Sequence, residues 1–223
     1  MRQIDKNTVS SKGQLKESEF VTFINPEGKG KRILFVGNSI TRHGILHDIG
    51  WHTDCGMAAS DIEKDYVHIV AREAGKVYED AAFCICQLAV WERQYKNGNE
   101  TYSMIEAARD FAADIIIMRC VENCPYGDLD HEAFNSQYKM LIDFLNASGK
   151  AEVIATSGFW KHPGDVEIEK VAKERGYKYI YLGDLGENDE MKAIGLFEHE
   201  GVANHPGDKG MQAIADRILE QIL

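Results

Sequence analysis

Three polar segments of the chain carry a serine, an asparagine and a histidine, residue types whose side chains could take part in catalysis. The first is Gly37-Asn38-Ser39, which directly follows the apolar run Arg32–Val36. A serine at the end of a buried strand, where the chain turns, exposes its hydroxyl above the sheet beside backbone N–H groups that could stabilise an oxyanion. The alternative interpretation is that Ser39 only caps a following helix.

The other two segments surround Asn123 and His205. Asn123 follows the apolar run Asp114–Arg119, and an asparagine at the carboxyl end of a central strand can offer its side-chain N–H to the same oxyanion. His205 precedes the last amphipathic stretch, and a histidine there can fold over the sheet edge toward the first loop. Taken singly, a turn-forming Asn123 and a structural His205 are the simpler interpretations.

The elements that must position these residues follow from the alternation of apolar runs and amphipathic stretches after residue 31. Buried strands are predicted over 32–36, 82–88, 114–119, 152–156 and 179–182. Helices are predicted over 60–74, 104–111, 134–145, 165–175 and from 208 onward; a Ser60-x-x-Glu63 capping box opens the first, and Gly75 ends it. The pattern predicts an α/β fold: a three-layer α/β/α sandwich with a roughly five-stranded parallel, flavodoxin-like sheet. Ligands bind such sheets at the carboxyl ends of the strands, where the three polar segments lie.

Residues 1–30 are polar and weakly patterned, apart from the short apolar stretch Phe20–Ile24. We expect them to form an N-terminal arm that adds a strand or packs along the body, because they are too few for a domain. Residues 31–223 are expected to form a single domain, since 223 residues match one domain of ordinary size or two very small ones.

Composition excludes several classes of partner. The 36 acidic and 25 basic residues give a formal net charge of −11, which disfavours nucleic acid and anionic membrane surfaces. No apolar run approaches the ~20 residues of a membrane span, and the first 20 residues lack the apolar core of a signal peptide. The chain is expected to be cytoplasmic, although an exported protein without its signal would have the same composition. Its oligomeric state is left open.

Two groups of residues could suggest a metal site. Cys84-x-Cys86 lies inside an apolar run, and Cys120-x3-Cys124 follows another, so both pairs are interpreted as core thiols. The second group follows Ser39 and consists of His43, His47, Asp48, His52 and Asp54. Gly44 and Gly50 interrupt any helical face that would align these side chains, which favours a polar loop at the rim of a pocket. No metal or other cofactor is predicted.

Together, the three polar segments resemble those of the SGNH hydrolase superfamily, also called GDSL-like esterases. The resemblance runs from about residue 31 to 223. Gly37-Asn38-Ser39-Ile40-Thr41 is close to the Gly-Asp-Ser block of that family, with Asn in place of Asp, and His205-Pro206-x-Asp208-x-Gly210-Met211 is similar to its C-terminal His block.

The resemblance implies hydrolysis of an ester. Ser39 would be the nucleophile and His205 the general base. The backbone N–H of Ser39 and the side chain of Asn123 would hold the oxyanion. Small single-domain members of the family often remove acetyl groups from carbohydrates, and this chain has no long apolar flap that would suit long acyl chains. A short-chain, acetyl-type small-molecule ester is therefore the expected substrate.

Two departures from the family pattern affect the site. The family places a Gly, as a further oxyanion donor, after its second strand, where this chain has Gln87 and Leu88. The backbone N–H of either residue could replace it. The family also places an Asp three residues before the histidine, and Val202 stands there. Glu200, Glu198 or a main-chain carbonyl could orient the imidazole instead, and Glu200 or a carbonyl is favoured.

The substrate pocket is expected to include Asn38, Trp51, Gln87 and Trp160, with Trp160 as the best candidate to stack on a sugar ring. Partly buried tryptophans that close the core are the alternative. Because of Val202 and the missing Gly, a non-catalytic or weakly active sugar-binding module on the same fold is the second functional hypothesis. A nucleotide-binding protein is the third, and it is weak because no Gly-x-Gly-x-x-Gly or Gly-Lys-Ser/Thr segment is present.

Overall fold

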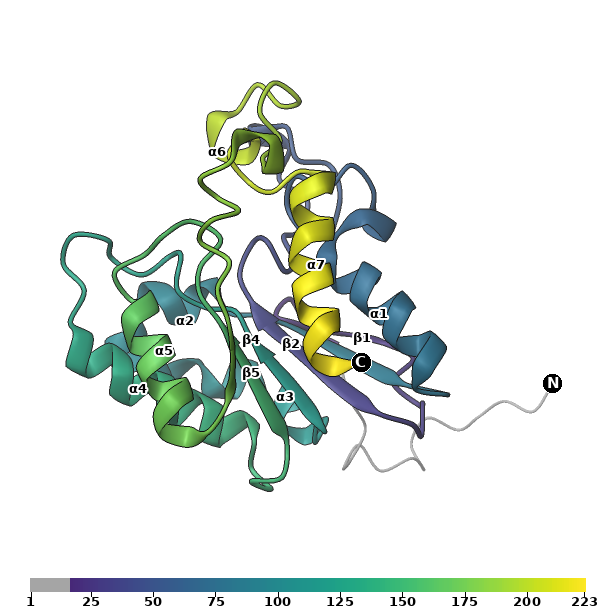
Figure 1. Ribbon diagram of the computed structural model, residues 1–223, viewed down its shortest axis with the longest axis vertical. Coiled ribbons are helices and arrows are strands. Elements are labelled where there is room, and N and C mark those ends of the chain that lie inside the picture. Colours follow the sequence, from purple (N-terminus) through teal and green to yellow (C-terminus); the bar gives the residue numbers. More distant parts are fainter. Residues whose placement is uncertain (1–16) are drawn as a thin grey trace, which may run out of the picture.

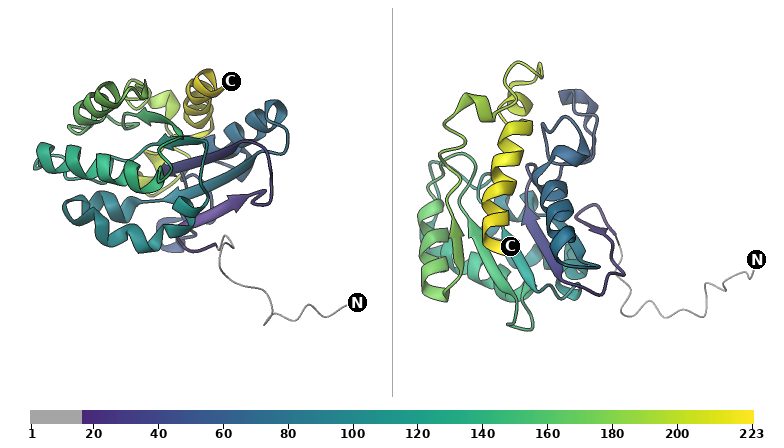
Figure 2. Two further views of the ribbon diagram at one scale, coloured as in Figure 1. Left: turned by 90° about the horizontal axis from the view of Figure 1, so that it is seen from below. Right: turned by 45° about the vertical axis from the view of Figure 1, so that its right-hand side comes forward.

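A computed structural model of the protein, which describes residues 17–223, contains a six-stranded sheet between two layers of helices (Figures 1 and 2). The strands are β1 (Val21–Ile24), β2 (Arg32–Gly37), β3 (Ala82–Gln87), β4 (Ile115–Met118), β5 (Glu152–Thr156) and β6 (Lys178–Ile180). Their order in the sheet is β1-β3-β2-β4-β5-β6. The five strands from β3 to β6 in this order are parallel, which confirms the predicted flavodoxin-like sheet.

The α-helices are α1 (Tyr66–Val77), α2 (Ala89–Arg93), α3 (Glu106–Asp110), α4 (His131–Leu145), α5 (Asp165–Arg175), α6 (Glu200–Ala203) and α7 (Asp208–Ile222). Short 3₁₀ segments cover His47–Ile49, Ile62–Lys64, Tyr95–Met104 and Asp189–Met191. Helices α1 and α7 cover one face of the sheet, while α3, α4 and α5 cover the other. The short helix α6 lies at the end of the molecule where α7 begins (Figure 1).

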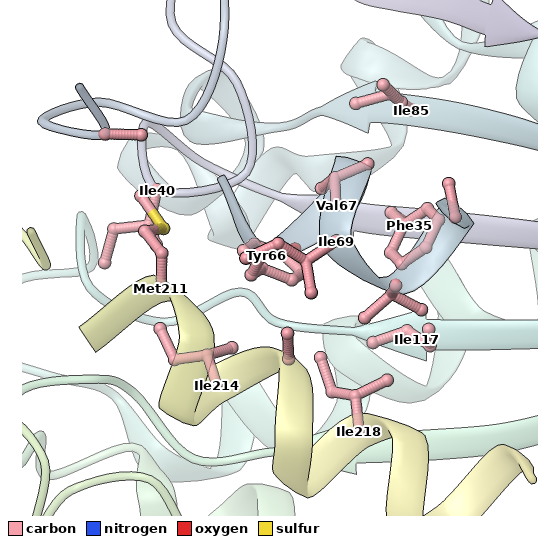
Figure 3. Packing of buried hydrophobic residues seen from close by; sticks show 14 of the residues in the cluster. Phe35, Ile40, Tyr66, Val67, Ile69, Ile85, Ile117, Met211, Ile214 and Ile218 are labelled. Atoms are coloured by element: carbon pink, nitrogen blue, oxygen red, sulfur yellow. The ribbon is translucent and has the colours of Figure 1, made fainter. Parts of the chain in front are cut away.

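Both faces of the sheet are buried because its strands are apolar at successive positions. In β2, Ile33 and Phe35 belong to the core beneath α1 and α7, whereas Leu34 and Val36 belong to the opposite core. Side chains of a strand alternate between faces, so an unbroken apolar run can fill two cores. Figure 3 shows the first core, in which Phe35 packs among residues of α1 and α7.

The first helix does not begin where the sequence predicts. Helix α1 starts at Tyr66, and the Asp65 carboxylate caps it by accepting the His68 N–H at 2.7 Å. The predicted capping residue, Ser60, instead donates its hydroxyl to Asp208 at 2.7 Å and so ties the loop to α7. Gly75 lies inside the helix, which continues to Val77. A capping box is a local signal, and here a buried Asp and a tertiary contact replaced it.

The described part of the N-terminal arm includes β1. Its residues Val21–Ile24 pair antiparallel with β3 and form the sheet edge, and the side chain of Val21 is fully buried. Residues 1–16, which belong to the same predicted arm, lie outside the described residues.

All five cysteines are free and buried, as expected for core thiols. Among residues 17–223, no group of three or more His, Cys, Asp or Glu side chains is arranged to hold a metal ion. Within the same range, no helix is both long and apolar enough to cross a membrane.

Candidate active site

The loop after β2 presents Ser39 at the carboxyl end of the sheet. Gly37 is required there, because a Cβ atom at this position would lie 1.9 Å from the Thr41 Oγ1 atom. The chain turns at once: the N–H groups of Thr41 and Arg42 both donate to the Asn38 carbonyl, at 2.9 and 3.0 Å. It then continues as an irregular loop rather than a helix, so Ser39 is not a helix cap.

Ser39 and His205 are in direct contact across 166 positions of sequence. The Ser39 Oγ atom lies 2.8 Å from His205 Nε2, and His205 Nδ1 lies 2.6 Å from the Gly201 carbonyl oxygen. A carbonyl oxygen can only accept, so in the neutral ring Nδ1 carries the proton and Nε2 accepts the serine hydroxyl. This is the tautomer that a general base for Ser39 requires.

Helix α6 is the element that presents the Gly201 carbonyl. It is one turn long, and the His199 Nδ1 atom caps it by accepting the Val202 N–H at 3.3 Å. Val202 is fully buried and its carbonyl accepts the His205 N–H at 3.0 Å. Its apolar side chain therefore serves the core, at the position where the resembled family has an acid.

This geometry contradicts the expectation that the Glu200 side chain orients the His205 ring. Glu200 is the exposed first residue of α6, and its backbone carbonyl accepts the Asn204 N–H. Among residues 17–223, no carboxylate is hydrogen-bonded to the His205 ring, and the acceptor at Nδ1 is a main-chain carbonyl. Gly201 stands four positions before His205, which is about one helical turn, so its backbone carbonyl reaches the ring. The side chain of Glu200 does not take that position.

His205 is neutral over most of the pH range. Burial lowers the pKa of His205 to about 4, against the opposing effect of the Gly201 hydrogen bond. Arg119 and His43 lower this pKa further, while Glu122 raises it. A neutral imidazole at pH 7 is ready to accept the serine proton.

The expected oxyanion donors differ in their availability. Within residues 17–223, the Ser39 N–H has no hydrogen-bond acceptor, so it is available to a substrate oxygen. The Gln87 N–H donates to the Phe20 carbonyl at 2.8 Å, and the Leu88 N–H donates to Gly37 at 2.5 Å. Neither can replace the missing glycine, which corrects the expectation that one of them would. The contact with Phe20 arises because β1 extends the sheet beside β3.

Asn38 does not line a pocket, in contrast to the expectation. It is 1% exposed, and its Nδ2 atom donates to Glu92 Oε1 at 2.9 Å and to Glu122 Oε2 at 2.6 Å. Its Oδ1 atom accepts from Arg119 Nη2 at 3.1 Å. Both polar atoms of the Asn38 side chain are thus engaged, and the side chain anchors the loop that carries Ser39.

Asn123 lies at the edge of the same buried network. Its Nδ2 atom donates to Glu92 Oε2 at 2.5 Å, and its Oδ1 atom accepts from Arg93 Nη2 at 3.4 Å. One N–H of the amide is therefore bound to Glu92 and the second remains.

Sequence reasoning missed the three charged members of this network, Glu92, Arg119 and Glu122. Glu92 and Arg119 are fully buried, and Glu122 accepts from both Nη atoms of Arg119 at 2.7 Å. Burial and the nearby Glu122 carboxylate raise the pKa of Glu92 to about 7, while the Asn38 and Asn123 amides and Arg119 lower it. The only sequence signal was the position of Arg119 and Glu122 next to Asn123 after an apolar run.

The structure brings Trp160 next to His205. The rings of Trp160 and His205 meet edge to face, with centroids 5.2 Å apart. The loop that carries Trp160 is held by Asp165, which accepts the Gly158 N–H at 2.8 Å, and by Glu122, which accepts the Phe159 N–H at 2.9 Å.

The other expected pocket residues lie elsewhere. Trp51 is 2% exposed and packs in the core near Phe197, with its Nε1–H donated to the His43 carbonyl at 3.0 Å. It therefore closes the core instead of contacting substrate, which corrects the expectation. Gln87 lines a cavity of about 280 Å³ between the loop after β2 and the arm, together with Phe20 and Arg42.

No family model of protein sequences and no curated protein matches the chain. Its structure is similar to solved structures of esterases. One is a two-domain esterase active on acetylated mannans, with 13% identity and a TM-score of 0.53 over 89% of this chain and 51% of that one. The chain therefore spans about half the length of that esterase.

Two further structures match over nearly their whole length. An acetyl xylan esterase has 18% identity and a TM-score of 0.54, over 86% of this chain and 100% of that one. A protein from Parabacteroides merdae described as a GDSL-like lipase has 15% identity and a TM-score of 0.58, over 86% and 95%. These likenesses establish a shared fold, that of the GDSL-like lipases and carbohydrate esterases which the three polar segments resemble.

Proposed function

We propose that the protein is a serine esterase that hydrolyses short-chain, acetyl-type esters. The observation that carries this proposal is the 2.8 Å contact between Ser39 Oγ and a His205 ring whose tautomer the Gly201 carbonyl fixes. The likeness of the fold to that of esterases adds support.

In the proposed reaction, Ser39 Oγ attacks the ester carbonyl while His205 Nε2 takes the hydroxyl proton. The oxygen of the tetrahedral intermediate is held by the Ser39 N–H and by the side chain of Asn123. The protonated ring then gives its proton to the leaving alcohol, and the acyl group remains on Ser39. Water, deprotonated by His205, releases the acid and restores the enzyme.

For the substrate, we propose an acetylated carbohydrate. Trp160 packs edge to face against the His205 ring, and an aromatic side chain beside the proposed general base suits a sugar ring. Two of the similar structures are described as esterases of acetylated mannans and acetyl xylan. We expect kcat/KM to fall from acetyl to octanoyl esters. Each methylene left unburied forfeits the ~0.8 kcal/mol that a matching apolar pocket would supply. A rise toward octanoyl would contradict an acetyl-type pocket.

The test is hydrolysis of p-nitrophenyl acetate and of acetylated xylo- and manno-oligosaccharides by the wild type and by Ser39→Ala. A fluorophosphonate should label the wild type at Ser39, located by peptide mass spectrometry. Ser60→Ala is a matched control, because it removes a serine hydroxyl bound to Asp208, outside the proposed site. Equal turnover by wild type and Ser39→Ala would overturn the proposal.

The alternative is a non-catalytic or weakly active sugar-binding module on the same fold. Two observations favour it: no carboxylate among residues 17–223 contacts the His205 ring, and the Gln87 and Leu88 N–H groups are occupied. A wild type that binds oligosaccharides in calorimetry yet is neither labelled by the fluorophosphonate nor active on acetyl esters would support this alternative.

A further inference from the structure

Glu92 is a fully buried carboxylate that has no part in the Ser39–His205 chemistry. It lies on the short helix α2, and its two oxygens are divided between two amides: Oε1 accepts from Asn38 and Oε2 from Asn123. Removing a carboxylate from water costs several kcal/mol unless hydrogen bonds and charges compensate. The compensation here comes from the amides of Asn38, which precedes Ser39 in the chain, and of Asn123, the proposed oxyanion donor, together with the charge of Arg119.

The Asn123 amide is held in one orientation by partners of opposite kind. The ionised Glu92 carboxylate can only accept, so it selects the Nδ2 atom of Asn123. The Arg93 guanidinium can only donate, so it selects Oδ1. Among residues 17–223, the second N–H of Asn123 Nδ2 has no acceptor, which leaves it for a ligand.

We propose that Glu92 is a positioning residue whose ionised carboxylate keeps an N–H of Asn123 directed at the oxyanion. This inference rests on the proposed esterase function. When Glu92 is protonated, its hydroxyl needs an acceptor, and the Asn123 carbonyl oxygen satisfies that need if the amide turns over and gives up its longer, 3.4 Å contact with the exposed Arg93 guanidinium. The turned amide presents oxygen in place of N–H to the substrate oxygen, and the tetrahedral intermediate loses a donor. The enzyme thus acquires a pH-dependent oxyanion site.

The groups that face Glu92 set the pH at which this change occurs. Burial raises the pKa of Glu92, and so does Glu122 from the loop after β4; the Asn38 and Asn123 amides and the guanidinium of Arg119 lower it. The thiols of Cys120 and Cys124 also face Glu92, and burial raises their pKa values, so they remain neutral and do not titrate with it. Ionisation of Glu92 therefore falls near neutrality, and activity should be lost as the pH decreases through that range.

The first experiment compares the pH dependence of kcat in the wild type and in Asn123→Ala, with p-nitrophenyl acetate between pH 4 and 8. The wild type should show an inflection near neutrality, with kcat falling on the acidic side, in addition to the inflection of His205 at lower pH. Asn123→Ala should lose ~10²–10³ of kcat, the usual cost of one oxyanion donor, and should lack the inflection near neutrality. An inflection that persists unchanged in Asn123→Ala, or that is absent from the wild type, would overturn the inference.

The second experiment uses Glu92→Gln, alone and with Asn123→Ala. Asn38 Nδ2 can only donate, so the new amide at position 92 must turn its oxygen to Asn38 and its N–H to Asn123, which favours the turned Asn123 amide; Glu92→Gln should therefore lower kcat by ~10²-fold with little change in KM. The double variant should be no slower than Asn123→Ala, because the two residues act through one donor. Additive losses would assign Glu92 a merely structural role.

Glu167→Gln is the matched control. Glu167 also accepts from an asparagine amide, Asn135 Nδ2 at 2.9 Å, but at the contact between α4 and α5. It should retain wild-type kcat and the wild-type pH profile. If Glu92→Gln does not fold, as judged by circular dichroism, the comparison of wild type and Asn123→Ala still decides.

Failure of this inference is separable from failure of the proposed function. If Ser39→Ala is inactive but the pH profile of the wild type is the same as that of Asn123→Ala, the esterase function is supported and the proposed role of Glu92 is wrong. An active Ser39→Ala removes the function on which the inference rests.

Discussion

The polar residues on the two sides of Ser39 are oriented by different kinds of hydrogen-bond acceptor. On one side, His205 is oriented by the main-chain carbonyl of Gly201, with no carboxylate of residues 17–223 bonded to its ring. On the other side, Asn38 and Asn123 are oriented by the buried carboxylate of Glu92. The charge that a triad places beside the histidine lies instead on the side of the proposed oxyanion.

The two sides therefore depend on different properties of their acceptors. A carbonyl fixes the tautomer and the direction of the imidazole, but it carries no net charge to stabilise the imidazolium. A carboxylate holds its partners strongly only while it is ionised, so that side responds to pH and to substitution of side chains. We therefore expect the histidine side to tolerate side-chain changes around it and the oxyanion side to be sensitive to them.

The largest expected effect is loss of either partner in the Ser39–His205 contact. Ser39→Ala and His205→Ala should each lower kcat by at least ~10³, and the double variant should be no worse, because the two groups act as one unit. The melting temperature should change little in Ser39→Ala, since the side chain lies on a loop. Steady-state kinetics with calorimetry checks this, and comparable turnover in His205→Ala would remove the ring from the proposed reaction.

The pH dependence of kcat/KM tests the histidine side of Ser39. Because burial lowers the pKa of His205 to about 4, the loss of kcat/KM that is due to His205 should occur only when the pH decreases toward that value. At pH 5.5, an imidazole with an ordinary pKa of ~6.5 would be about 90% protonated, so activity there should exceed that of an exposed histidine by about 10-fold. The measurement is best made in Asn123→Ala, in which only the His205 inflection is expected. An inflection at 6.5 or above would contradict a desolvated ring.

The sign of the effect on stability is the same. A histidine whose pKa is lower in the folded state than in the unfolded state binds fewer protons when folded, so its contribution to stability decreases as the pH falls from about 6.5 toward 4.

A smaller effect is expected for Trp160, which lies on the histidine side. Trp160→Ala removes the ring next to His205, and an aromatic contact of ~0.5–1.5 kcal/mol corresponds to about 2–10-fold in KM for an acetylated sugar. Trp160→Phe should recover most of the loss, and p-nitrophenyl acetate should be affected less than the sugar. Equal losses on both substrates would indicate that Trp160 supports the His205 ring instead of binding carbohydrate.

Much of the fold could be predicted because it depends on continuous apolar runs and long amphipathic helices. The predicted helix 165–175 matches α5, and strand 152–156 matches β5. The start of α1 and the existence of α6 could not be predicted, since both depend on contacts with distant parts of the chain. Helix α6 is only four residues long and contains a glycine, which no periodicity reveals.

In the candidate site, too, some groups could be predicted from the sequence and others could not. Ser39 and His205 could be identified as candidates because their residue types and their places after β2 and before α7 suit the chemistry. The Gly201 carbonyl could not be, because a main-chain acceptor leaves no signature in the sequence. Glu92 was missed for another reason: a glutamate in the segment Ala89–Arg93 has the same appearance as one on a solvated helix face, and only the structure shows that it is buried.

The smallest expected effect is the most direct test of the histidine side. Glu200→Gln removes the acid that stands nearest before His205 in sequence, but the Nδ1 partner is the Gly201 carbonyl at 2.6 Å. If that carbonyl is sufficient, Glu200→Gln should retain wild-type kcat and KM on p-nitrophenyl acetate. If Glu200 instead moved to the ring during the reaction, its loss would lower kcat by ~10²–10⁴, by analogy with the removal of the acid from a triad. Since Glu200 is exposed, the substitution should not disturb folding, so a drop of that size could be assigned to the chemistry. If kcat and KM are nearly unchanged in Glu200→Gln while His205→Ala is inactive, the two results would establish a Ser–His dyad oriented by the main chain.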